Sequence, residues 1–148
     1  QQTSGLKYRT ATQTLDSTTL TADDTFTATL VAGRKYSGIA VWFGTIGTAA
    51  DGFQIDFNGG TATATAFAAR MLVDSGGSVA CNVFSSAALD TAMTTTAGTV
   101  GTTFTVIAYF SITCNAAGTF IPKFAKIADA GTGVILGVGS FWFMEDMP

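Results

Sequence analysis

Hydrophobic and polar residues alternate with a period of two along several stretches of this chain. Residues 26–30 and 53–57 show the pattern over short distances. The longest case is 102–114, where apolar residues occupy every second position from Phe104 to Ile112. This period is that of β-strands, whose side chains point alternately to the two faces of a sheet. The second face of 102–114 is partly apolar too, which predicts a central or enclosed strand.

Two further stretches are apolar on both faces. In the first, Trp42 alternates with a set of three apolar residues, Ile39, Val41 and Phe43. The second is 140–147, in which Phe141 and Phe143 alternate with Trp142 and Met144. The pattern predicts a strand in each case. We place Ile39, Val41 and Phe43 together on one face, with Trp42 on the other.

Clusters of Gly, Asn and Asp separate these stretches and predict turns. Their spacing gives about eight to ten strands. The segment 61–72 is rich in Ala, which permits a helix, but its Thr–Ala alternation favours a strand. The segment 85–93 is compatible with a short helical turn or a loop. Pro122 cannot donate to a ladder, so it points to a sheet edge or a bulge.

The fold class that follows is all-β. A chain of 148 residues normally forms one domain, so we expect a single β-sandwich over 1–148. About eight antiparallel strands in one domain must pair into two sheets or close up. A jelly-roll-like sandwich is our prediction, with an immunoglobulin-like sandwich as the alternative. Residues 1–14 form either an extended N-terminal arm or the first strand.

Composition supports sheet and adds a tendency to associate. Apolar residues make up 47% of the chain and charged residues only 11%, against roughly 25% in ordinary soluble domains. Thr, Ala and Gly fill the difference, and Thr suits a half-exposed strand. A surface with so little charge and so much apolar area favours association. We therefore expect an oligomer or a subunit of a larger assembly.

The charge and the apolar stretches argue against two kinds of partner. A net charge of −3 with no dense basic stripe speaks against nucleic acid. The longest apolar stretch, 133–143, is too short and too rich in Gly for a bilayer, which needs about twenty residues. Cys81 and Cys114 are the two cysteines. Cys114 falls in phase with the apolar positions of its strand, so we expect a buried thiol rather than a disulfide.

The chain lacks most of the side chains that enzymes use. It has no histidine, which removes Ser-His-Asp and Cys-His catalysis and most zinc sites. The carboxylate pairs Asp51–Asp56 and Glu145–Asp146 are the remaining candidates for glycoside hydrolysis. We read them as solvated carboxylates of turns and strands, without a raised pKa. Asp23 and Asp24 are read as a turn rather than a calcium site. We expect no enzymatic activity, no metal and no cofactor.

Two segments carry a resemblance to a known family. The first runs from Ser17-Thr-Thr-Leu through Asp23-Asp24 and Ala32-Gly-Arg-Lys-Tyr36 to Trp42-Phe43. The second joins Gly118-Thr-Phe-Ile-Pro-Lys-Phe-Ala-Lys126 to Gly139-Ser-Phe-Trp-Phe-Met-Glu-Asp146. Together they resemble a group of small tailed-phage virion proteins, described as structural, tail or decoration proteins. The resemblance covers about the first third and the last fifth of the chain.

This resemblance implies a structural role without catalytic residues. We expect a capsid decoration or cement protein, made in the host cytoplasm and located on the capsid surface of the virion. Its partners would be copies of itself, as a homotrimer, and the major capsid protein or other virion proteins. The alternative is a tail or baseplate component, including a receptor-binding tip that contacts host glycans.

The residues expected at contacts with partners are of two kinds. The basic ones are Lys7 and Arg9, near the N-terminus. The others are apolar positions that look exposed in the alternation, namely Trp42, Phe67, Phe84, Trp142 and Met144.

Overall fold

The computed structural model describes residues 5–48, 52–58, 60–75, 82–95, 102–128, 131 and 133–147. These residues form fourteen strands and no helix. The strands are β1 (Lys7–Tyr8), β2 (Gln13–Leu15), β3 (Thr21–Ala22), β4 (Ala28–Leu30), β5 (Lys35–Ile46), β6 (Phe53–Phe57), β7 (Thr63–Ser75), β8 (Asn82–Ser86), β9 (Met93–Thr94), β10 (Thr103–Ala116), β11 (Gly118–Phe120), β12 (Pro122–Lys126), β13 (Val134–Leu136) and β14 (Phe141–Met147).

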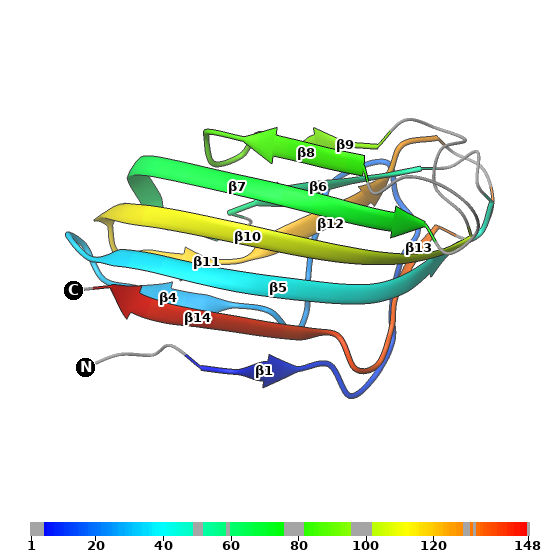
Figure 1. Cartoon of the computed structure of the whole chain (residues 1–148), viewed down its shortest axis with the longest axis horizontal. Coiled ribbons are helices and arrows are strands. Elements are labelled where there is room, and N and C mark those ends of the chain that lie inside the picture. The colour runs from blue at the N-terminus through cyan, green and yellow to red at the C-terminus, as the bar shows by residue number, and fades with distance from the viewer. Residues whose placement is uncertain are drawn as a thin grey trace.

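One layer of the molecule is a long sheet that faces the viewer in Figure 1. Its order is β1-β14-β5-β10-β7-β8, and β13 and β2 continue the lines of β14 and β1. Every strand pair in it is antiparallel. The strand at its centre is β10, which pairs with β5 on one side and β7 on the other. This agrees with the central strand predicted over 102–114.

The second layer lies behind the long sheet (Figure 1). It consists of the sheet β3-β12-β6-β9 and the short pair β11-β4. Ile121 separates β11 from β12, and its carbonyl accepts the backbone N–H of Asn58. Pro122 begins β12 at this interruption and is paired with Phe57. The irregularity predicted at Pro122 is therefore the interruption between β11 and β12.

The connectivity is that of a jelly roll. We count β1/β2, β3/β4, β11/β12 and β13/β14 as four interrupted strands. The pairs are then nested: β1/β2 with β13/β14, β3/β4 with β11/β12, β5 with β10, and β6 with β9. Apart from β6 and β9, which both lie in the second layer, and the hairpin β7–β8, successive strands alternate between the two layers, as in two Greek keys. The hairpin β7–β8 extends the long sheet beyond β10. The predicted all-β, jelly-roll-like sandwich is confirmed.

An aromatic core joins the two layers. Phe53 of the second layer lies 4.6 Å from Phe104 of the long sheet, measured between ring centroids. Trp42 and Phe124 meet edge to face at 5.0 Å. Such tilted and edge contacts are the preferred geometry of aromatic pairs and add to the gain from burial. The core holds one contiguous cluster, as expected for a single sandwich.

Two glycines of β5 make room for this core. Gly38 is paired with Phe110 and Gly44 with Phe104 across the β5–β10 ladder. A Cβ atom on Gly38 would lie 2.4 Å from the Phe110 ring, and one on Gly44 would lie 2.4 Å from the Phe104 ring. Each ring therefore covers a glycine of the neighbouring strand, a device that also pins strand register.

The segments left open by the sequence form strands or turns. Most of 61–72 belongs to β7, as the Thr–Ala alternation favoured. Within 85–93, the end of β8 is followed by bends and a turn. Of residues 1–14, those from 5 onward are described, and β1 and β2 pair with β14 and β13. This part of the chain is thus an interrupted outer strand of the long sheet.

Candidate functional site

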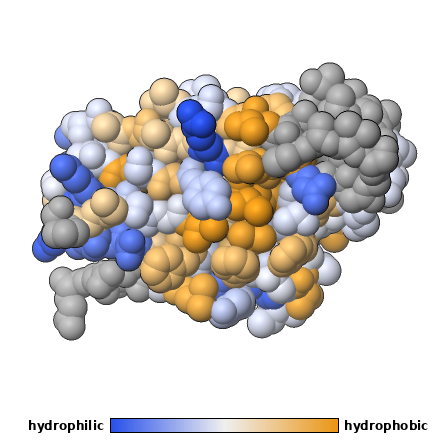
Figure 2. All heavy atoms as spheres, in the orientation of Figure 1, coloured by the Kyte–Doolittle hydropathy of each residue, from blue (hydrophilic) through white to orange (hydrophobic). Residues whose placement is uncertain are grey.

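The outer face of the long sheet carries apolar side chains in register across six strands. One cross-strand row, here called the central row, consists of Tyr8, Phe141, Val41, Ile107, Leu72 and Val83. It passes from one edge strand to the other without a charged residue. Figure 2 shows a band of hydrophobic side chains running across the strands of this face. Directly opposed side chains on one face interact, so the row is one continuous apolar surface.

A second row lies two residues along the strands and is called the tyrosine row. It contains Phe143, Ile39, Tyr109, Arg70 and Ser85. Tyr109 is 52% exposed and Phe143 is 40% exposed. On the other side of the central row lies the threonine row, Phe43, Thr105 and Asp74. Phe43 is 42% exposed. Large apolar side chains with this exposure mark a candidate contact surface.

Two shallow hollows flank Tyr109 on this face. One, of about 530 Å³, is lined by residues 68–70, Leu72 and 109–111. The other, of about 370 Å³, lies between Ile39, Tyr109 and Phe143. The outer face is therefore not flat. It combines projecting aromatic rings with depressions of side-chain size.

The sequence-based contact residues lie mostly elsewhere. Trp42, Trp142 and Met144 are at most 1% exposed and belong to the core, as does Phe67 at 8%. Phe84 is half-buried against that core, and Lys7 is half-buried. The expectation that these apolar positions are exposed is wrong for Trp42, Phe67, Trp142 and Met144.

The physical reason is that alternation fixes the period of a strand but not its phase. Both faces of β5 and β14 are apolar, so the pattern is compatible with either orientation. In the fold, Trp42 points inward and contacts Phe26 and Phe124 of the second layer. Phe43 lies on the opposite face of β5 from Trp42, as predicted, but it is Phe43 that is exposed and Trp42 that is buried. The small residues Gly38, Ala40 and Gly44 beside Trp42 were the available signal, since only a packed inner face needs such space.

Arg9 is likewise buried, at 1% exposure, where the outer strand is interrupted between β1 and β2. Its guanidinium forms ion pairs with Asp23 and Asp24, and its Cζ atom lies over the ring of Phe26, 5.7 Å from the ring centroid. The Asp23 carboxylate also accepts hydrogen bonds from Trp42 Nε1 and from the backbone N–H groups of residues 25 and 26. Asp23 and Asp24 form a turn, as predicted, but Asp23 is buried. Both of its carboxylate oxygens accept hydrogen bonds from groups within the fold.

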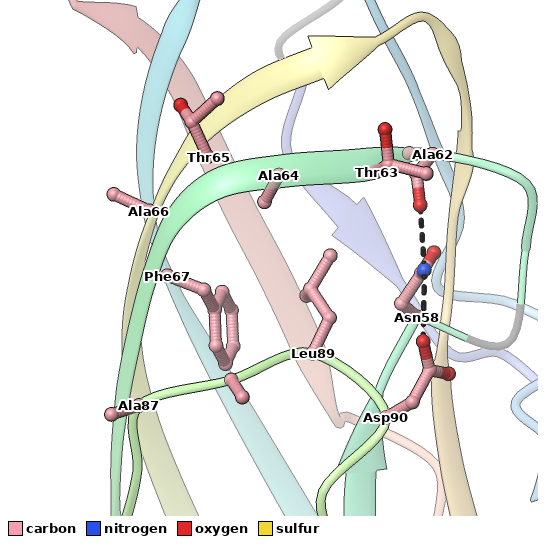
Figure 3. A pocket seen from close by; sticks show the side chains of 11 residues that line it. Asn58, Ala62, Thr63, Ala64, Thr65, Ala66, Phe67, Ala87, Leu89 and Asp90 are labelled. Carbon is pink, nitrogen blue, oxygen red and sulfur yellow. Dashed lines mark hydrogen bonds between the residues drawn. The ribbon is translucent and has the colours of Figure 1, made fainter.

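A pocket of about 430 Å³ lies between the start of β7 and the turn 87–90 (Figure 3). Phe67 and Leu89 form apolar walls, and Asn58 and Asp90 supply polar groups. Asn58 Nδ2 donates to the Ala62 carbonyl at 2.6 Å and to the Asp90 carboxylate at 3.4 Å. This combination of an aromatic ring with a few fixed polar groups is typical of small-ligand sites.

Asp56 lies close to this pocket but does not line it. The Asp56 residue is 2% exposed, and its carboxylate pairs with Lys123 at 3.2 Å, while Lys123 also reaches Asp90 at 3.4 Å. Burial raises the pKa of Asp56, against the lowering effect of Lys123. Our reading of Asp56 as a solvated carboxylate with an ordinary pKa is wrong. The alternation along 53–57 correctly predicts that Asp56 lies on the polar face of its strand, but this face is buried in the fold rather than exposed to solvent.

The other candidate chemistry is distributed as follows. Asp51 and Cys81 lie outside the described residues. Glu145 is exposed, and Asp146 pairs with Arg34 at 3.0 Å. Cys114 is a buried free thiol whose pKa is raised by burial. The described part of the chain has no group of three or more His, Cys, Asp or Glu suited to a metal ion.

Comparison of the chain with protein-family models, curated proteins and solved structures finds no match. Among the described residues there is no helix with the length and apolar character needed to cross a membrane. The function is therefore inferred from the fold and the surfaces described above.

Proposed function

We propose that this protein is a non-enzymatic structural component of a bacteriophage virion, most simply a capsid decoration or cement protein. The observation that carries the proposal is the central row, an apolar surface that crosses all six main strands of the long sheet. A folded domain gains nothing from such a surface on its own. Burial of this surface against another protein contributes favourable free energy in proportion to its area.

The rest of the molecule fits a role in a shell. With only 11% charged residues, its contacts would rest mainly on apolar area and on backbone pairing, with few ion pairs. Strands at the sheet edges, β1 and β8, offer backbone groups for strand addition by a neighbouring coat protein. The resemblance of the two ends of the chain to small tailed-phage virion proteins points to the same setting. The major capsid protein is the expected partner besides further copies of this chain.

The experiment is to locate and count the chain in purified virions. Hundreds of copies per particle, with density on the capsid surface in a map of the intact particle, would support the decoration role. A few to a few dozen copies at the tail would contradict it and favour a tail or baseplate component. Absence of the chain from purified virions would overturn both.

The tail alternative, a tip that contacts host glycans, is favoured by one observation. The pocket near Asn58 and Asp90 combines an aromatic wall, Phe67, with polar groups (Figure 3). Glycan-array binding that is lost in Asp90→Ala and kept in Asp24→Ala would support the tip. The tryptophans cannot serve this test, because both are buried in the core.

A further inference from the structure

We infer that two copies of this chain pair face to face through the outer surface of the long sheet, about a two-fold axis that runs along the central row. The inference rests on the proposed function, since it names the partner for the apolar surface that carries it. Three features of the face support a second copy as its occupant: the self-match of the central row, the placement of two charges, and the fit of a ring into a hollow.

The central row matches itself under this symmetry. A two-fold axis that lies along the row places each strand of one copy above the same strand of the other copy, and the two strands run in opposite directions. Each of the six positions then meets the same position of the other copy. Phe141, Ile107 and Leu72 therefore meet apolar side chains and no charge. Identical patches that contact each other in this way are the hallmark of two-fold interfaces.

Two charged residues are placed symmetrically about this axis. Arg70 lies in the tyrosine row and Asp74 in the threonine row, two residues to either side of Leu72 on β7. The axis brings Arg70 of one copy over Asp74 of the other, and this contact occurs twice. Both side chains are exposed, and in the described part of the chain neither forms an ion pair. The face is thus complementary in charge to a second copy of itself.

The same operation places a projecting ring over a hollow. Phe43 in the threonine row is related by the axis to Ile39 in the tyrosine row. Ile39 lies in the hollow of about 370 Å³ that Tyr109 and Phe143 border. The half-exposed Phe43 ring of one copy therefore enters the hollow of the other. Fit between projections and depressions of this kind is what distinguishes specific interfaces from chance contacts.

The area is sufficient for a stable pair. With strands about 4.8 Å apart and rows about 6.8 Å apart, the face from Ser37 to Thr45 spans roughly 700 Å² before side-chain relief is included. Specific interfaces bury about 800 Å² per partner. The two sheets would stack at about 10 Å, the ordinary spacing of sandwich layers. This two-fold pair is an alternative to the homotrimer expected from the sequence, because a three-fold arrangement would not bring Arg70 and Asp74 together in reciprocal contacts.

Charge reversal tests the inference. We would measure the mass in solution, by light scattering and native mass spectrometry, of the full chain and of the variants Arg70→Asp, Asp74→Arg and the double variant. Each single variant places like charges together twice, so pairing should weaken on the order of a hundredfold. The double variant exchanges the two charges and should pair like the original. Circular dichroism verifies that every variant keeps its strand content.

A mixture of the two single variants gives the decisive result. One variant then carries two acids at these positions and the other carries two bases, so the inferred geometry predicts a mixed pair although neither variant pairs alone. Lys35→Asp on the same face, far from the axis, is the control and should pair normally. A monomer or a trimer for the original chain, or failure of the mixture to pair, would overturn the inference. Such a result would leave the virion role standing, because that role is tested by location and copy number in the particle.

Discussion

At the scale of single residues, the Arg9–Asp23 pair fixes the point at which the outer strand is interrupted. The backbone N–H of Arg9 donates a hydrogen bond to the Ser140 carbonyl, and the Arg9 carbonyl accepts one from the Gly139 N–H. Ser140 and Gly139 lie between β13 and β14, so the neighbouring strand is interrupted at the same level. The Arg9 side chain turns inward at this interruption. Because its guanidinium is charged and buried, it needs a buried anion beside it. A buried pair contributes little net stability while intact, but removal of one partner leaves the other charge uncompensated.

Asp23→Ala should therefore lower the free energy of unfolding by about 3–5 kcal/mol. In this variant the buried guanidinium of Arg9 and the indole N–H of Trp42 lose their partner, Asp23. The hydrogen bond from Trp42 to Asp23 measures 3.0 Å. Urea unfolding followed by tryptophan fluorescence gives the value. Asp24→Ala is the matched control, because the Asp24 side chain also pairs with Arg9 but is 58% exposed. We expect the control to cost less than about 1 kcal/mol, and equal losses in the two variants would contradict the argument.

Asp56 makes stability depend on pH in a defined direction. Its pKa in the folded protein is raised above 3.8 by burial. Between 3.8 and that raised pKa, the folded state holds a proton that the unfolded chain has released, so stability falls as the pH rises. Above the raised pKa the full cost of the buried charge is present, and below 3.8 it is absent.

The test is the difference in unfolding free energy between the original chain and Asp56→Asn, measured from acid to neutral pH. The original should lose stability relative to the variant as the pH rises. Glu145→Gln changes the net charge by the same amount at an exposed site outside the Asp56–Lys123–Asp90 cluster, and separates the local effect from overall charge. A difference that does not vary with pH would show that the Asp56 carboxyl titrates alike in the folded and unfolded chains.

At the scale of elements, the register of β5 depends on its glycines. A Cβ atom on Gly38 would lie 2.6 Å from the Phe143 carbonyl oxygen, a backbone atom held in the β5–β14 ladder. Gly38→Ala should therefore destabilise the fold by about 1–3 kcal/mol, the cost of overpacking. Ser37→Ala, the adjacent outward position, is the control and should change stability by less than about 0.5 kcal/mol. Chemical unfolding of both variants measures the difference.

The strands themselves were largely predictable from the sequence. The run 102–114 became the central β10 because its alternation is long and its second face is partly apolar. The orientation of β5 and β14 was not predictable from alternation, because either face suits a core. It is decided by bulk: Trp42 and Trp142 find space only against the second layer. Of the candidate surface, the sequence showed the apolar residues and the low charge but assigned the wrong side to the core.

At the scale of the whole molecule, some features depend on residues far apart in the chain. The Arg9–Asp23 contact spans 14 residues and the Lys126–Asp16 ion pair spans 110. No local pattern reveals such pairs, because each partner by itself reads as a surface charge. The central row has the same origin: its six residues come from six strands and are aligned only by the jelly-roll pairing. The surface that suggests a function is thus a property of the topology.

If two copies pair through this surface, folding and assembly are one linked equilibrium. The pair forms only from folded chains, so mass action stabilises the fold as the concentration rises. Tenfold more protein should add about 1.4 kcal/mol to the unfolding free energy of the pair. The thermal midpoint of the original chain should therefore rise with concentration. That of Arg70→Asp should stay constant, because its face no longer pairs. A midpoint that is independent of concentration for both proteins would mean that the fold is stable with its apolar face exposed, and that this face is reserved for a different partner in the particle.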